Sequence, residues 1–463
     1  MSNPTAPASA PPPDNTNSND DPLGRGAHPS PWRFEPCIGI WQGLINPVLV
    51  SVPVILLKSM GVSNAVIGWA SFATLPMAIK FLFGPVIDAN KTKRWWILRS
   101  GEWLMVALAL LALSLMQQTF SIWLYLSALT VLAVVKSFQQ IALNGFFTLS
   151  LTKSEQALFS GLDPVFGRVA TVISGSVLIA MAGIIGERYH DPRITWGSYF
   201  GILILIFFFL YLYTRKVFPT PVADRPHRDD KGKEGAVPIV DVLRNYFKLP
   251  CLWAGIAYIF FLRSGETFIS KMGPAFLMDK ADAGGLGMTV PEVGVATGIM
   301  SVCAMAGGAL SGMLLRKHGL RKVVWWFTAA AIIPSLIYVY LAVHQGEHHV
   351  IEWNFAWIGI DYIWRFDWLL MLLLGGENFG FGLGFTVMNF YMFRMAAESK
   401  YPASFVALNA SVIYVSFLFF GAISGVVQEA VGYAWLFTLS VIVSLPAFAA
   451  IPFLNYKLDE RGK

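Results

Sequence analysis

The sequence predicts an all-α integral membrane protein with twelve transmembrane helices arranged in two six-helix halves. Three observations support this prediction. Of the 463 residues, 55% are hydrophobic and only 13% are charged, which leaves too few polar residues to cover a water-soluble protein of this size. Long apolar segments recur along the chain. One polar segment divides them into two sets of six.

Each apolar segment is long enough to cross a bilayer, which takes about 20 helical residues. Lipid offers no hydrogen-bond partner to an open strand edge, so we expect these segments to be helices. The predicted ranges are 34–58, 64–88, 95–116, 121–148, 157–185, 195–215, 250–275, 291–315, 323–343, 367–393, 403–428 and 433–456.

Composition divides the chain into five parts. Residues 1–32 are rich in Pro, Asn, Ser and Asp and lack the basic start and apolar centre of a signal peptide, so we expect a disordered cytosolic tail. The first half is predicted over 33–215, a cytosolic linker over 216–249, the second half over 250–456 and a short cytosolic tail over 457–463.

Basic residues indicate the orientation of the chain. They gather after the second apolar segment, in the linker and after the eighth segment, whereas the opposite loops are poorer in Lys and Arg. Loops rich in Lys and Arg stay in the cytoplasm. The sequence therefore predicts a multi-pass protein of the cytoplasmic (inner) membrane with both termini in the cytosol, and the net charge of +6 does not call for a nucleic-acid partner.

A charged motif occurs at the same place in each predicted half. GPVIDANKTKR and GMLLRKHGLRK both begin with a glycine, have a charged residue four positions later and end in a basic cluster. Glycine lets two helices approach closely, and the charges could then hold the helix ends together; ordinary basic loops are the alternative. The candidate gating residues are Gly84, Asp88, Arg94, Gly312, Arg316 and Arg321.

Twelve apolar segments with this repeated motif resemble the major facilitator superfamily. GVSNAVIGWASFATLPMAIKFLFGPVID, LTKSEQALFSGLDPVFGRVATVISG, FLRSGETF and GGENFGFGLG resemble segments of bacterial muropeptide permeases (AmpG-like), in the peptide and acetyl-CoA transporter group. The resemblance implies a substrate site between the halves, alternating access by rocking and a role in peptidoglycan recycling. The chain departs from the permeases at Gln140 and Asn144, where they have acids, and at Glu266, where they have aspartate.

Two cations lie deep in apolar segments of the first half. Lys80 is eight residues before Asp88, hence roughly 12 Å from the end of its segment, and we expect its ammonium to face a central cavity. A lysine that extends to the headgroups is the alternative. Arg168 could bind a substrate carboxylate through two parallel hydrogen bonds, unless it forms a structural pair with Asp163 or Glu377.

The second half contains buried acids. Arg263 and Glu266 are three residues apart on one helix face, where they either neutralise each other or take part in transport. Glu377 lies beside Asn378 in the tenth segment, where packing requires no carboxylate. Glu266 and Glu377 are the candidate proton-coupling acids and Asn378 is a candidate substrate contact, with a permanent ion pair as the alternative for Glu377. Lys271 is predicted to reach the headgroups.

Four polar residues form a stripe on the fourth segment: Lys136, Gln139, Gln140 and Asn144. Offsets of three, four and eight residues place them on one helix face. The stripe predicts a water-lined path, and hydrogen bonds between helices are the alternative. Lys136, Gln140 and Asn144 therefore join Lys80 as candidate substrate-binding residues.

The sequence shows no sign of enzyme chemistry. It has no GxxxxGK[ST] run, which argues against ATP-driven transport, and no catalytic triad or metal-ligand pattern; HQGEHH, residues 344–349, is interpreted as a loop. We expect no cofactor and no metal. The leading hypothesis is a monomeric secondary transporter that imports an anionic peptide- or sugar-containing solute with protons. The alternatives are import of another amphipathic acid, such as a siderophore, and a non-transporting receptor or assembly factor.

Overall fold

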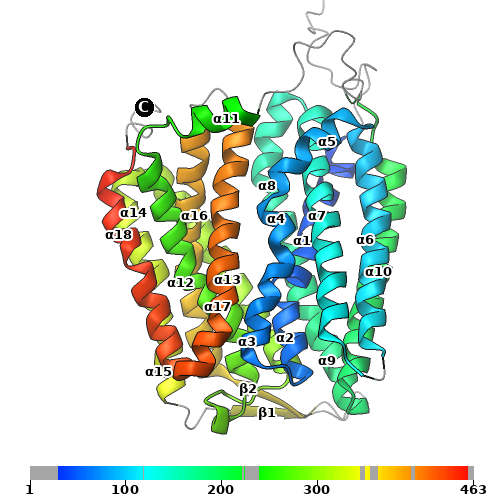
Figure 1. The fold of residues 1–463 in the computed structure, drawn as a ribbon, viewed down its shortest axis with the longest axis vertical. Helices are drawn as coiled ribbons and strands as arrows, with labels where there is room; N and C mark the ends of the chain where they lie inside the picture. Colours follow the sequence, from blue (N-terminus) through cyan, green and yellow to red (C-terminus); the bar gives the residue numbers. More distant parts are fainter. Residues whose placement is uncertain are drawn as a thin grey trace, which may run out of the picture.

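A computed structural model shows a helical bundle with one short hairpin (Figure 1). The structure describes residues 30–117, 119–221, 224, 239–344, 350–354, 363–397 and 402–456. Calls on the tails, on most of the linker and on 345–349 of HQGEHH therefore fall outside the described residues.

The helices form two groups that lie side by side in Figure 1. The N-terminal group consists of α1 (Glu35–Leu49), α2 (Val52–Ser59), α3 (Asn64–Trp69), α4 (Leu75–Ala78), α5 (Gly84–Ala89), α6 (Lys93–Leu115), α7 (Ile122–Ser150), α8 (Lys153–Val172), α9 (Leu178–Tyr189) and α10 (Pro192–Val217). Shorter helical turns connect some of them: η1 (Pro31–Arg33), η2 (Ala70–Thr74), η3 (Lys80–Phe83) and the π-helical η4 (Ile173–Val177).

The C-terminal group follows α11 (Ile239–Tyr246). It consists of α12 (Leu252–Met278), α13 (Val290–His318), α14 (Leu320–Ile332), α15 (Leu336–Val343), α16 (Trp368–Ala397), α17 (Pro402–Ser444) and α18 (Pro446–Ala450), with the turns η5 (Ala281–Ala283), η6 (Ile333–Ser335) and η8 (Ile451–Phe453). Strands β1 (Val350–Asn354) and β2 (Ile363–Asp367) pair antiparallel, with Val350 opposite Asp367. This hairpin was not expected from the sequence.

Ten helical stretches among the described residues are long and apolar enough to cross a membrane. One of them contains α17, whose 43 residues would extend about 65 Å if straight, roughly twice the hydrocarbon thickness of a bilayer. α17 breaks at Gly432, where φ is 78°, so it consists of two helices. α12 is 27 residues long but is not one of the ten, because its three charged side chains lower its hydropathy.

The first two predicted segments are broken rather than straight. Pro47 lies inside α1 and Pro53 opens α2, while Pro76 opens α4 and Pro85 opens α5. Proline cannot donate the backbone hydrogen bond that continues a helix. The second segment consequently runs through α3, η2, α4, η3 and α5, and this irregular path places Lys80 in a 3₁₀ turn.

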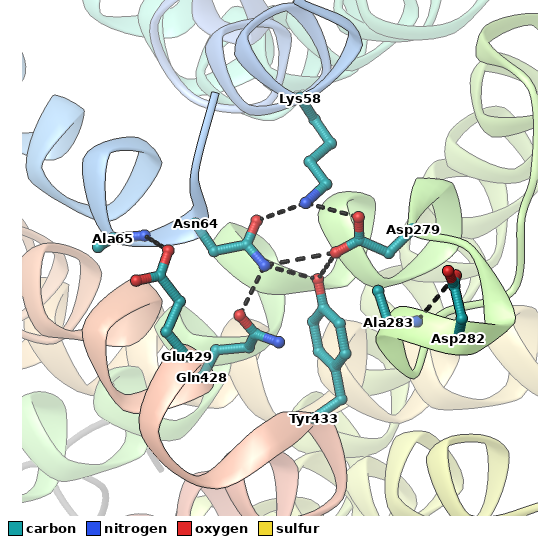
Figure 2. Close-up of polar contacts among 9 residues, drawn as sticks. All are labelled: Lys58, Asn64, Ala65, Asp279, Asp282, Ala283, Gln428, Glu429 and Tyr433. Carbon is teal, nitrogen blue, oxygen red and sulfur yellow. Dashed lines mark hydrogen bonds and ion pairs between the residues drawn. The ribbon is translucent and has the colours of Figure 1, made fainter. Parts of the chain in front are cut away.

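The two groups are joined at the end of the bundle that carries the hairpin, here called the hairpin end (Figure 2). Lys58 Nζ lies 2.6 Å from Asp279 Oδ1 and donates to Asn64 Oδ1 at 2.8 Å. The Asn64 amide donates to Gln428 Oε1 at 2.6 Å and to the Tyr433 hydroxyl at 3.0 Å. Tyr433 in turn donates to Asp279 Oδ2 at 2.6 Å. We call these five residues the lock.

A second seam at the hairpin end joins η4 and α9 to α13. Ser176 Oγ donates to the Gly294 carbonyl at 2.5 Å, and Thr297 Oγ1 donates to the Gly175 carbonyl at 3.1 Å. A Cβ atom added to Gly294 would come within 2.7 Å of the Ala180 backbone nitrogen. Glycine is therefore required for this close approach of the two groups.

The opposite end carries the repeated charged motif and is called the basic end. A Cβ atom added to Gly84 or Gly312 would meet nothing within 4 Å, so the close helix approach expected from these glycines is absent from this structure. Arg94 donates to the backbone carbonyls of Phe218 and Arg215, at 3.1 and 2.9 Å. Its described contacts therefore stay within its own group and the segment that follows it.

The remaining motif residues show no clamp between the groups either. Arg316 is exposed, and the Arg321 guanidinium lies 5.8 Å from the ring of Tyr456 in the C-terminal group itself. The side chain of Asp88 is outside the described part of the structure. The groups thus meet through packed glycines and polar contacts at the hairpin end, while the motif glycines of the basic end are uncovered.

Candidate functional site

Lys80 points between the two groups. Its Nζ donates to Gln140 Oε1 of α7 at 3.0 Å and lies 5.1 Å from the ring of Tyr414 on α17. A cation is attracted to the electron-rich face of an aromatic ring at this range. The ammonium is therefore directed to α7 and to the other group, and not along α5 to the basic end.

Gln42 of α1 connects the polar residues of α7, although the sequence analysis did not single it out. Its carbonyl accepts from Lys136 Nζ at 3.3 Å, and its side chain bonds to Asn144 at 3.4 Å and to Gln140 at 3.5 Å. We call Gln42, Lys80, Lys136, Gln140 and Asn144 the amide cluster. A glutamine inside an apolar segment is the signal that would have identified Gln42.

Of the four residues in the stripe predicted on α7, three share contacts with Gln42 and one does not. Lys136 is fully buried, Gln140 is half-buried and Asn144 is exposed, and all three contact Gln42. Gln139 is also fully buried, but neither of its side-chain polar atoms has a hydrogen-bond partner. Gln139 therefore takes no part in the amide cluster, because it is one residue before Gln140 and points about 100° away from it around the helix.

Two arginines from opposite groups approach one aromatic ring. The guanidinium carbon of Arg168 on α8 lies 5.8 Å from the ring of Phe385 on α16, and that of Arg263 on α12 lies 5.4 Å from the same ring. Arg168 is exposed, and it has no carboxylate within 4 Å among the described residues. The structural pair with Asp163 or Glu377, the alternative for Arg168, is therefore not formed.

Arg263 and Glu266 form an ion pair. Arg263 NH1 lies 2.7 Å from Glu266 Oε2, and the two side chains are only 12% and 21% exposed. A narrow pocket beside this pair is lined by Phe381, Phe385 and Ser335, among others. Glu266 thus has a counter-charge, whereas Arg168 has none.

Glu377 is a buried acid without a cation partner among the described residues. It is 4% exposed, and it accepts a hydrogen bond from the neighbouring Asn378 amide at 2.8 Å. Asn378 also donates to the Leu374 carbonyl at 3.2 Å, so its amide is used within α16. The alternative of a permanent ion pair for Glu377 is not formed among the described residues, and the charge that acts on Glu377 is that of another acid, Glu266.

Lys271 does not anchor the protein at the headgroups, so that prediction was wrong. The residue is 2% exposed, and its Nζ lies 4.6 Å from the ring of Phe417 on α17. α12 packs along α17 over much of its length, so this face of the helix is turned inward. The aromatic ring compensates part of the cost of burying the ammonium.

The described residues contain no group of three His, Cys, Asp or Glu side chains that could hold a metal ion.

Comparison with known proteins identifies the family. The Major Facilitator Superfamily model matches residues 40–360. The chain belongs to the Major Facilitator Superfamily. It is a membrane transporter of that superfamily rather than an enzyme.

Curated relatives of this superfamily cover nearly the whole chain. "Putative transporter AmpG 4" of Rickettsia conorii is 22% identical over 433 residues, which are 91% of this chain and 96% of that protein. "Putative transporter AmpG 1" of Rickettsia bellii is 22% identical over 412 residues, or 85% and 90% of the two chains.

Solved structures share the fold. A variant of the nucleoside transporter NupG has a TM-score of 0.60 at 14% identity and covers 92% of this chain and 99% of its own. A bacterial homologue of the human drug peptide transporters PepT1 and PepT2 has a TM-score of 0.61 at 14% identity, with coverage of 90% and 97%. At this identity the likeness concerns the fold alone.

Proposed function

We propose that the protein is a proton-coupled secondary transporter that imports an anionic peptide- or sugar-containing solute of the muropeptide class by alternating access. In this proposal twelve helices form two six-helix halves in the cytoplasmic membrane, and a monomer is the working unit. One observation carries the proposal: Arg168 and Arg263 come from opposite groups to one ring, and Arg168 has no carboxylate of its own.

A guanidinium deep in a membrane protein that has no carboxylate partner is costly unless it serves a ligand. Arg168 offers a planar pair of donors that matches a carboxylate, and Lys80 with the amide cluster adds a second cation and several amide groups. A solute with both a carboxylate and many amide or hydroxyl groups would satisfy this set. The AmpG names of the curated relatives agree with a muropeptide-like solute.

The contacts between the groups support an inward-facing state. The lock and the glycine seam close the hairpin end, and the motif glycines are uncovered at the basic end. Since loops rich in Lys and Arg stay inside, the basic end would face the cytosol. In the outward-facing state the lock would separate, and Gly84 and Gly312 would become covered.

This orientation predicts the labelling of a cysteine placed in the linker. Cysteine at Gly232, in a variant that lacks the native cysteines, is expected to resist a membrane-impermeant maleimide in intact cells and to react after permeabilisation. Cysteine at the exposed Asp282, beside the hairpin end, is the matched control and should react in intact cells. The opposite pattern would reverse the proposed topology.

Arg168→Lys tests the contact with the solute. Lysine keeps the charge but loses the planar fork, so we expect the affinity for an anhydro-muropeptide to fall by roughly ten- to a hundredfold, which corresponds to one charge-assisted hydrogen bond. Binding to purified protein is measured by calorimetry, with Arg365→Lys on the exposed hairpin as the control. Equal affinities for Arg168→Lys and wild type would show that Arg168 does not bind the solute.

The buried acids are tested by transport in proteoliposomes. Wild-type protein should accumulate labelled anhydro-muropeptide when only a pH gradient is supplied, whereas a receptor would bind it without accumulation and a siderophore importer would leave it outside. Glu377→Gln and Glu266→Gln should each lower accumulation sharply and keep exchange of solute across the membrane, because an amide cannot carry a proton. Accumulation by both variants at the wild-type level would remove these acids from the coupling step.

A further inference from the structure

The N-terminal group contains two buried acids that the proposed function does not use. Glu35 on α1 is fully buried, and neither of its carboxylate oxygens has a hydrogen-bond partner. Asp163 on α8 is partly buried, and its Oδ1 atom also lacks a partner. Unpartnered carboxylate oxygens are rare in protein interiors, because each buried charge without a partner is costly.

Close helix packing holds the two acids together. α1 and α8 cross through glycines: a Cβ atom added to Gly43 would overlap the Gly167 backbone, and one added to Gly39 would come within 2.9 Å of Asp163 Oδ1. Gly39 is one helical turn after Glu35, so both acids lie at the same part of the α1–α8 contact. Their charges repel each other.

Lys136 on α7 is the cation that faces this pair. It attracts Asp163, but its Nζ forms no ion pair within 4 Å with any described residue and instead donates to the Gln42 carbonyl at 3.3 Å. Among the described residues of the elements packed against α1, one further titratable group interacts with the pair: Cys37 of α1 itself, which the charge of Glu35 reaches. Lys136 therefore lies between the acid pair and the amide cluster.

We propose that Glu35 and Asp163 share a proton that exchanges with water during transport, which makes them a second coupling site, in the N-terminal group. The inference rests on the proposed function and adds to the acids of the C-terminal group. Two neighbouring carboxylates do not both ionise readily. One shared proton leaves a single negative charge, which the Lys136 ammonium balances.

The coupling step follows from the position of Lys136. An anionic solute that binds the amide cluster attracts the Lys136 ammonium away from the pair. The remaining carboxylate then lacks its counter-charge and takes up a proton from water, so that –COO⁻ becomes –COOH. When the solute leaves, Lys136 returns and the same O–H bond breaks, which releases the proton. Solute and proton therefore bind together and leave together.

Infrared difference spectroscopy on the full-length protein in lipid bilayers tests the shared proton without any solute. We expect a band from protonated carboxyl groups that changes with pH and is diminished in both Glu35→Gln and Asp163→Asn. The matched control, Asp282→Asn on the exposed η5 turn, should leave that band unchanged. A band that does not change with pH, or that both variants retain, would overturn the proposal, and either variant alone is sufficient if the other does not fold.

Transport by the same variants tests the link to solute. Under a gradient of one pH unit, each coupled proton supports about tenfold accumulation, so Asp163→Asn and Glu35→Gln should lower the accumulation of labelled anhydro-muropeptide by about that factor and keep its exchange. Unchanged accumulation in both variants would overturn the coupling role. If wild-type protein accumulates no anhydro-muropeptide, the proposed function fails, while the infrared result still decides whether the pair exchanges a proton.

Discussion

The lock at the hairpin end is the interaction on which the arrangement of the two groups depends. Asn64 accepts from Lys58 and donates to Gln428 and Tyr433, so one side chain joins α2 and α3 to α17. Lys58 and Asp279 add a partly buried ion pair between the groups. Such pairs contribute little net stability compared with apolar packing, but breaking one is costly, which suits a contact that must open as a unit.

Several interior charges form no ion pair among the described residues. They include the cations Lys80, Lys136 and Arg168 of the N-terminal group and the acid Glu377 of the C-terminal group. Burial of unpaired charge raises the energy of the protein. Binding of an anionic solute at the cations and of a proton at the acids would lower this energy. The same residues therefore account for both substrates of the proposed symport.

The sequence predicted the helices well, since a helix that crosses lipid must be long and apolar, and each predicted range overlaps a described helix. It also singled out Lys80 and Arg168, because a charge in an apolar run is conspicuous. It could not predict which charges meet. Lys271 was misassigned because its contact with Phe417 depends on how α12 rotates against α17. Glu35 was missed because it lies at the start of the first predicted segment, where acids usually face water.

The sequence could not predict the hairpin or the conformational state. Strands β1 and β2 are only five residues long each, so no long apolar pattern marked them. Gly84 and Gly312 fit a close helix approach in sequence, yet a Cβ atom added to either would meet nothing within 4 Å in this structure, which agrees with the proposed inward-facing state. A single sequence encodes both states, and the pattern of uncovered glycines is seen only in the structure.

Distances between spin labels at the two ends test alternating access about the lock most directly. In a variant without native cysteines, one label pair is placed at Met60 and Asp282 near the hairpin end and another at Val86 and Lys317 near the basic end. Asp279→Asn should lengthen the first distance and shorten the second, while Glu352→Gln on the exposed hairpin should change neither. If both distances stay fixed in Asp279→Asn and throughout transport by the wild-type protein, the lock is not a gate and the account is wrong.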